Sequence, residues 1–376
     1  MEFTSDFVSQ VDQKQSAIQS LFSDSTEQTG IDIEEKIEKH WHDAPSVSQS
    51  SDISKYAVDG SRVTRRFSNG AELLVCQSLM IGGDGSENEE YKEMFVDAYR
   101  GPGNPDITRR YARLISHLTE IEVILQNWEH VDEGSVIYID GSIHGRYLHS
   151  LWPFQLEGRE DIPLKLLQKH INLIEKAQEK DVLLIGVSKT SQVRALAGEF
   201  GAEVPDTELL YKHTSSPGVT TPVLLGGYGF DQDEFQWLDM NPERFANRIF
   251  TDAVSKDEAL KTIERLADSP AIATFHVRME QNQETMRVDV PANSIGVEDT
   301  ITSLTRSRLI DPEHIKDAYS HVSADYGGAK VYNCLLYTVD ELVRLNQDTV
   351  DKVYLKILRD ELDTDIELTR SYRRFM

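Results

Sequence analysis

The stretch "YAVDGSRV", residues 56–63, has a near copy in "VIYIDGSIHG", residues 136–145. In both, an Asp-Gly-Ser tripeptide follows a short apolar run rich in β-branched and aromatic residues, which is the composition of a buried strand. Glycine accepts a positive φ and serine bonds a nearby amide, so this tripeptide lets a strand end in a turn. Two such strands in one sheet would bring Asp59 and Asp140 together at its rim.

The composition is that of a folded and strongly acidic protein. The chain has 376 residues, 39% of them hydrophobic, and a formal net charge of -25. That charge repels nucleic acid over most of a surface. It is also tolerated in a salt-adapted cytosol, because the Debye length falls to about 3 Å at molar salt, and we favour this explanation. Cys76 and Cys334 lack metal-ligand spacing, so neither a disulfide framework nor a zinc site is expected.

The chain shows no sign of a membrane segment. No apolar run approaches the roughly 20 residues that span a bilayer. The N-terminus is acidic, whereas a secretory signal is basic and then apolar. We therefore expect a cytoplasmic protein without membrane contact.

Hydrophobic periodicity divides the chain into three parts. Residues 1–50 predict an amphipathic helix and a polar linker, residues 51–350 the main domain, and residues 351–376 a charged helical tail. The main domain is expected to open as an antiparallel meander whose strands are joined by Asp-Gly-Ser and Asn-Gly turns. An acidic excursion over residues 84–106 follows it.

The rest of the main domain alternates strands with helices. This order, with apolar strands, predicts an α/β fold in which a partly parallel sheet carries helices on its faces. The expected helices cover residues 107–128, 161–181 and 332–347, and the expected strands cover 135–140, 182–189, 221–230, 271–280 and 285–291.

Carboxylates that meet at a sheet rim favour metal binding, because hard divalent cations take carboxylate oxygens. The helix at 107–128 offers a third carboxylate, Glu120 or Glu122. Glu122 falls within the apolar stripe of that helix and Glu120 points the opposite way, so helix phase favours Glu122. A buried Arg or Lys is the alternative partner for Glu122. The stripe consists of Tyr111, Leu114, Ile115, Leu118, Ile121 and Leu125.

Two further residues are candidates by position. Asp340 flanks the apolar stripe of the helix at 332–347 and would reach the sheet edge from there; its alternative is an ordinary solvated carboxylate. Lys189 ends the strand at 182–189, where a lysine meets a phosphate as a point charge. Its alternative is a surface lysine at a strand end.

The order of these features resembles the NurA family of archaeal and bacterial DNA-repair nucleases. The resemblance rests on "VDGS", a helix bearing Glu, "IDGS", "VSK" and the Tyr-rich "YNCLLYTVDELVRL", and it runs from Tyr56 to Leu345. It implies a ribonuclease-H-like mixed sheet core flanked by helices, with N-terminal and C-terminal helical appendages. The acidic composition favours a haloarchaeal member.

The resemblance also implies an activity and partners. The family members are manganese-dependent nucleases, with Mg²⁺ as a possible substitute, that act as 5′ to 3′ exonucleases and single-strand endonucleases on DNA. They form homodimers and work with a hexameric HerA-type ATPase in the resection of double-strand breaks. Matched motif by motif, Asp59, Glu122, Asp140, Lys189 and Asp340 are the expected catalytic residues, and all except Lys189 are expected metal ligands of a two-metal phosphodiesterase.

Other residues are candidates to contact DNA. Tyr332 and Tyr337 would stack on a splayed strand, with core packing as the alternative. A group of arginines would line a DNA path, with ion pairs or isolated surface positions as the alternative; they are Arg65, Arg66, Arg109, Arg110 and Arg113.

Two other functions fit parts of the pattern. Strand-Asp-Gly-Ser turns also serve as phosphate loops in actin-like and sugar-kinase-like ATPases. A non-catalytic DNA clamp or adaptor subunit would retain its function without Asp59.

Overall fold

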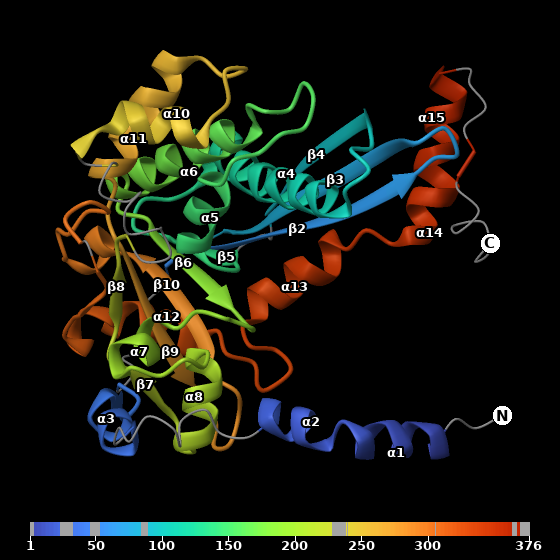
Figure 1. The fold of residues 1–376 in the computed structure, drawn as a ribbon. Coiled ribbons are helices and arrows are strands. Elements are labelled where there is room, and N and C mark those ends of the chain that lie inside the picture. The colour runs from blue at the N-terminus through green and yellow to red at the C-terminus, as the bar shows by residue number, and fades with distance from the viewer. Residues whose placement is uncertain are drawn as a thin grey trace.

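The computed structural model describes residues 4–22, 33–45, 53–83, 89–227, 238, 240–304, 306–362 and 367–368. The described residues build one 11-stranded mixed sheet with helices on both faces (Figure 1). Its main path runs β1-β7-β9-β10-β6-β5-β2-β3-β4, and β8 joins β9 and β11 beside that path.

One half of the sheet holds the Asp-Gly-Ser segments at residues 59–61 and 140–142. Three antiparallel strands form a meander, and two more strands continue the sheet parallel to the first of them. Two long helices make the crossovers, which parallel neighbours require. The predicted α/β fold with a ribonuclease-H-like mixed sheet is confirmed. These elements are β2 (Lys55–Arg66), β3 (Ala71–Gly83), β4 (Glu89–Arg100), α4 (Pro105–Gln126), β5 (Val136–Asp140), α6 (Ile162–Glu179) and β6 (Leu183–Ser188).

The other half continues the sheet beyond β6. A hairpin of β9 (Ile272–Arg278) and β10 (Met286–Pro291) pairs antiparallel with β6 through β10. The short strands at this end are β1 (Trp41–His42), β7 (Gly218–Thr220), β8 (Val223–Leu225) and β11 (Arg308–Leu309). The expected strand at 221–230 is present as β8, and residues 228–230 lie outside the described part.

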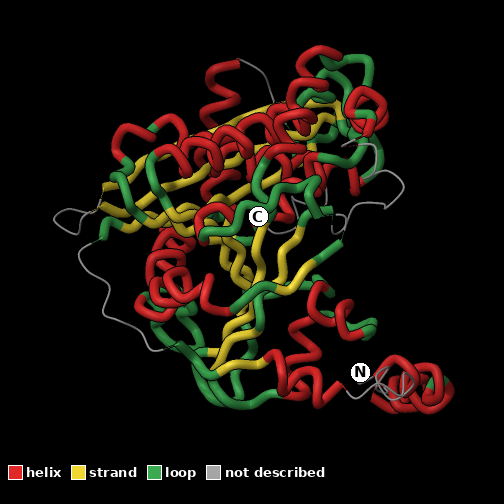
Figure 2. The backbone as a smooth tube through the Cα atoms, turned by 90° about the vertical axis from the view of Figure 1, so that its left-hand side faces the viewer, coloured by secondary structure: helices red, strands yellow, loops and turns green. Residues whose placement is uncertain are grey.

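Helices enclose the sheet from both sides (Figure 2). On one face, Tyr56 and Val58 pack with α4 and α6; on the other, Ala57 and Tyr138 pack with α12 and α13. This alternation follows from the two-residue period of a strand. The remaining helices are α5 (Ile143–Ser150), α7 (Ala195–Phe200), α8 (Asp206–His213), α10 (Pro242–Ile249), α11 (Lys256–Asp268), α12 (Lys316–Ala324) and α13 (Cys334–Val343).

Two expectations for the meander are wrong. The Asp-Gly-Ser at residues 59–61 is not a turn, because β2 runs straight through Asp59; the predicted Asn-Gly turn is present, and its Gly70 has a φ of 83°. The expected acidic excursion contains β4, an edge strand whose residues are alternately exposed and partly covered. Charged residues are typical of edge strands, because they discourage pairing with another chain.

Helices also occur at both ends of the chain, as predicted. The N-terminal ones are α1 (Thr4–Gln13), α2 (Gln15–Phe22) and α3 (Ile33–His40). The C-terminal segment holds α14 (Gln347–Thr349), a π-helical turn (Val350–Tyr354) and α15 (Leu355–Leu362). Val350 and Leu355 cover the far end of the β2–β3 hairpin. Much of the predicted linker and the last residues of the predicted tail lie outside the described residues. No helix in the described segments is both long and apolar enough to cross a membrane.

Candidate functional site

The parallel pairing of β2 with β5 brings the two aspartates of the repeated motif together. Val58 lies opposite Ile139, so Asp59 and Asp140 follow as neighbours at the end of the pairing. Both take the face that Ala57 and Tyr138 share, the face covered by α13. Asp59 is 8% exposed. Burial, together with the negative charges of Asp140, Glu120 and Asp340, raises the pKa of Asp59 to about 8.

The loop after β5 is fixed by hydrogen bonds. Gly141 has a φ of 90°, a conformation that favours glycine. Ser142 caps α5: its Oγ accepts from Gly145 N at 2.8 Å and donates to Asp289 Oδ2 at 2.6 Å. Asp289 is buried and is held by Arg287 and Thr274. The β10 carboxylate therefore anchors the loop that follows Asp140.

Glu120, rather than Glu122, is the helix carboxylate at the site. It is 6% exposed and lies against Gly60: a Cβ on that glycine would stand 2.6 Å from Glu120 Oε1. Glycine is thus needed at residue 60 for close approach and not for a turn. Glu120 Oε1 accepts from Ser116 Oγ at 3.1 Å, and Oε2 accepts from Arg146 Nη2 at 2.6 Å.

The prediction that Glu122 lies at the site is wrong. The alternative, in which a basic side chain is the partner of Glu122, is closer to the structure. Glu122 turns toward α6, where Lys169 Nζ lies 3.8 Å from its Oε1, and its side chain is 27% exposed. Burial raises the pKa of Glu122. The apolar stripe of α4 gave the wrong phase because this helix is covered both by the sheet and by α6, so the centre of its stripe does not point at the sheet.

Asp340 and Tyr332 approach from the α13 side. The charge of Asp340 raises the pKa of both Asp59 and Asp140, in each case after the larger effect of burial. Asp340 also accepts a 3.1 Å hydrogen bond from Arg344 and is partly exposed. Tyr332, which is buried, donates from Oη to Asp140 Oδ1 at 3.0 Å.

Lys189 lies beside the same aspartate, directly after β6. Its ammonium stands 4.1 Å from the centre of the Tyr332 ring, a cation–π contact. Burial raises the pKa of Asp140, and the positive charge of Lys189 opposes that rise. The structure thus brings four predicted site residues together, namely Asp59, Asp140, Lys189 and Asp340.

A basic groove adjoins these residues. It has a volume of about 870 Å³, and its described lining includes one acidic side chain, Asp140. A second hollow of about 430 Å³ continues it through the shared residues Arg62 and Arg113. The whole protein is strongly acidic, so this concentration of cations is a local exception. We call the larger hollow the basic groove. Its cationic residues are Arg62, Arg113, Arg146, Lys189, Arg194 and Arg287.

The arginines predicted to line a DNA path divide into two groups. Arg66, Arg109 and Arg113 line the hollows. Arg65 is buried in an ion pair with Asp351, as the alternative states, and Arg109 also pairs with Asp106. Arg110 follows neither interpretation, because it donates to backbone carbonyls near Trp152. Of the two tyrosines, Tyr332 is buried and Tyr337 is 42% exposed.

Sequence reasoning missed Arg62, Arg146 and the histidines of the groove. His117 and His149 stack with ring centres 5.4 Å apart, and both line the groove. A signal was present, since the Asp-Gly-Ser at residues 59–61 is followed directly by an arginine in "DGSR", and the one at residues 140–142 after three residues in "DGSIHGR".

The carboxylates of the site have the oxygen donors that a hard divalent cation prefers. In the described part of the chain, no three His, Cys, Asp or Glu side chains are already arranged as a ligand set. Four carboxylates nevertheless lie close together. The pKa of Asp59 is raised by the charge of each of the other three, which are Asp140, Glu120 and Asp340. Such mutual repulsion is relieved by a cation, and oxygen donors suit Mg²⁺ or Mn²⁺.

Known proteins share the fold of this chain. The NurA domain matches residues 54–345. The crystal structure of the NurA nuclease from Sulfolobus solfataricus is similar, with a TM-score of 0.62 and 16% identity over 96% of this chain and 98% of that one. A structure of NurA with manganese gives a TM-score of 0.56 and 15% identity over 93% and 98%. A search of curated proteins finds no match. The domain match covers most of the chain, which therefore belongs to the NurA family of nucleases.

Proposed function

We propose that this protein is a metal-dependent deoxyribonuclease that hydrolyses phosphodiester bonds where the basic groove meets Asp59 and Asp140. The observation that carries the proposal is the buried Asp59, which lies among other carboxylates at the end of a cation-lined groove. A polyanion drawn along the groove reaches the carboxylates at Lys189 and Asp140, because both line it.

Asp59, Asp140, Glu120 and Asp340 are the proposed metal ligands, with Glu120 in place of Glu122. Mn²⁺ is the preferred ion and Mg²⁺ the alternative; a similar NurA crystal structure with manganese supports this choice. Two ions would activate the attacking water and stabilise the leaving 3′ oxygen. Because the ligand set is not already assembled, we expect these side chains to draw closer when a cation binds.

The other residues of the site hold the substrate. Lys189 offsets charge on the scissile phosphate, and Arg62 and Arg113 contact phosphates further along the strand. Arg146 holds Glu120 in place by a buried ion pair. At high salt the counterion-release contribution to DNA binding is small, so enclosure in the groove has to supply much of the affinity.

Family membership supports the finer parts of the proposal. We propose 5′ to 3′ exonuclease and single-strand endonuclease activity in the resection of DNA double-strand breaks. The enzyme would act in the cytoplasm as a homodimer with a HerA-type hexameric ATPase. The acidic composition suits a salt-rich cytosol, as expected for a haloarchaeal protein.

End-labelled linear DNA at high KCl tests the proposal. Wild-type protein is expected to give product ladders with Mn²⁺ or Mg²⁺ and none with EDTA, and the label that is released first gives the polarity. Asp59→Asn should abolish cleavage, whereas Glu122→Gln should retain it. If wild type and Asp59→Asn are equally inert while both bind DNA, the nuclease proposal fails and the adaptor function replaces it.

A further inference from the structure

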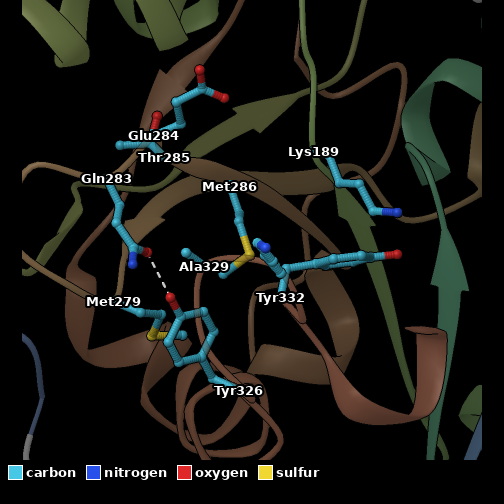
Figure 3. A pocket seen from close by; sticks show the side chains of 10 residues that line it. Lys189, Met279, Gln283, Glu284, Thr285, Met286, Tyr326, Ala329 and Tyr332 are labelled. Atoms are coloured by element: carbon cyan, nitrogen blue, oxygen red, sulfur yellow. Dashed lines mark hydrogen bonds between the residues drawn. The ribbon is translucent and has the colours of Figure 1, made fainter. Parts of the chain in front are cut away.

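A second cavity adjoins the basic groove at Lys189. It has a volume of about 350 Å³ and lies between the ends of β9 and β10, the loop that joins them, and the segment 326–332 before α13 (Figure 3). Lys189 lines both hollows. The cavity therefore begins where the groove ends, beside the carboxylates.

The cavity differs from the groove in the chemistry of its walls. Its walls include the thioethers of Met279 and Met286 and the rings of Tyr326 and Tyr332, and charged residues also line it, namely Lys189, Glu284 and Lys330. Aromatic rings stack on nucleobases, and thioether sulfur makes favourable contacts with ring edges. A volume of this size lies at the lower end of the range of about 300–1,000 Å³ for small-molecule sites. The thioethers and rings of these walls suit a flat ring such as a nucleobase.

Polar groups are placed among these apolar walls. Thr285 lines the cavity and is 2% exposed, and its hydroxyl has no hydrogen-bond partner within the described structure. Buried polar groups nearly always have hydrogen-bond partners, so we expect a ligand in the cavity to bond the Thr285 hydroxyl. Gln283 is oriented at the wall by two contacts: Tyr326 Oη donates to its Oε1 at 2.5 Å, and its Nε2 donates to Glu280 at 2.7 Å. Such groups can bond the polar edge of a base.

Tyr332 separates the cavity from the reacting carboxylates by one ring. Its hydroxyl bonds Asp140, while its ring forms part of the cavity wall. In Figure 3 the Lys189 ammonium and the Tyr332 hydroxyl point the same way, away from Met279 and Tyr326. A phosphate held at Lys189, beside Asp140, thus has the cavity next to it.

We infer that this cavity receives one nucleobase of the cleaved strand, from a nucleotide next to the scissile phosphate. The inference rests on the proposed nuclease function and adds a base subsite to it. A base stacked inside a duplex cannot enter such a cavity, so the subsite requires a single strand or a frayed end. It gives a physical basis for single-strand preference at this site.

An abasic scan with wild-type protein tests the inference. Single-stranded oligonucleotides of one sequence carry a tetrahydrofuran abasic residue that is moved one position at a time relative to the cut, and single-turnover cleavage is measured with Mn²⁺. The expected result is a loss of roughly 5- to 150-fold at one position next to the scissile phosphate. Equal rates at every position would overturn the subsite and leave the nuclease function standing. Absence of all cleavage would remove the nuclease function and the subsite with it.

A variant that fills the cavity gives an independent measurement. Ala329 is an exposed residue of the cavity wall, and Ala329→Phe would occupy the space of the base. This variant should cleave the intact oligonucleotide more slowly but match wild type on the oligonucleotide that is abasic at the sensitive position. Ala324→Phe, the same change at an exposed position on α12 outside the cavity, is the matched control and should behave as wild type on both. Equal slowing by Ala329→Phe on both oligonucleotides would contradict the inference.

Discussion

Arg146 Nη2 donates a 2.6 Å hydrogen bond to Glu120 Oε2, and both side chains are buried beneath the basic groove. Arg146 comes from α5, six residues after Asp140, and Glu120 comes from α4. Arg146 Nη2 also donates to the Asp140 backbone carbonyl at 3.1 Å. One guanidinium therefore ties the helix carboxylate to the strand end that carries the second aspartate.

Removal of the Arg146 guanidinium should lower the free energy of unfolding. Arg146→Met leaves Glu120 buried without its cation, and breaking a buried pair in this way costs about 3–5 kcal/mol. Urea unfolding at fixed KCl measures the loss. Arg344→Ala, which removes an exposed partner of Asp340, is the control and should cost less than about 1 kcal/mol. Similar losses in the two variants would show that the Arg146 pair is not buried in solution.

The two glutamates of α4 should differ sharply in their effect on activity. Glu120→Gln removes a carboxylate beside Asp59 and is expected to lower cleavage at least about 100-fold. Glu122→Gln removes a partly exposed carboxylate near Lys169 and should stay within about twofold of wild type. Initial rates on labelled DNA, with Mn²⁺ varied, separate weaker metal binding from slower chemistry. The reverse ranking would restore Glu122 to the site.

The motif residues could be predicted from sequence because each is attached to a strand. Asp59 and Asp140 follow apolar runs, and parallel pairing of neighbouring strands places them together without further information. Lys189 is the next strand end along the sheet. The structure therefore brings the predicted residues together wherever strand order alone fixed their positions.

The helix carboxylate could not be assigned in the same way. Helix phase identifies the centre of a buried stripe, but α4 is buried on two sides. The better signal was polar: Ser116, Thr119 and Glu120 form a small hydrophilic patch on a buried face, and Ser78 Oγ and Thr119 Oγ1 lie 2.8 Å apart across it. A polar patch inside an apolar helix face marks where a site begins.

The edge strand β4 was not predicted because its many charged residues obscure the alternation of apolar and polar residues that marks a strand. Residues Tyr91, Phe95 and Tyr99 recur at even spacing within β4, which is a strand pattern, but the intervening acids suggested an excursion. Asp97 faces inward as well and is paired there with Arg159 and Tyr111. Tertiary partners of this kind, distant in sequence, are invisible to a local pattern.

The loop after Asp140 should depend on its capping serine. Ser142→Ala removes the acceptor for Gly145 N and one donor to the buried Asp289, and the loss of stability should be about 1–3 kcal/mol. Because the same loop positions Asp140, the cleavage rate should also fall, while DNA binding at high KCl stays near wild type. Ser294→Ala, at an exposed position, is the control for stability. Unchanged stability and activity in Ser142→Ala would contradict the role of the cap.

Acid should destabilise the fold through a buried histidine. Burial, with a smaller effect of Arg146, lowers the pKa of His170 to about 3, whereas an unfolded histidine has its ordinary pKa of 6.5. The folded pKa lies below the unfolded one, so the stability from keeping this ring neutral is fully present above about pH 6.5. It is lost as the pH falls from there toward 3, because the unfolded chain then binds a proton that the fold excludes.

His170→Phe isolates this effect and keeps an aromatic ring against Tyr147, whose ring centre lies 4.5 Å from that of His170. Between pH 7 and pH 5.5, wild type should lose about 1 kcal/mol more unfolding free energy than the variant. Urea unfolding at both pH values gives the difference directly, and comparison with the variant cancels the titration of other groups. Buried acids such as Asp206, whose pKa is raised to about 6, act in the opposite direction and are common to both proteins. His213→Gln, at an exposed position of α8, should keep the wild-type pH dependence. If His170→Phe also kept it, the ring of His170 would be open to protonation in the folded protein.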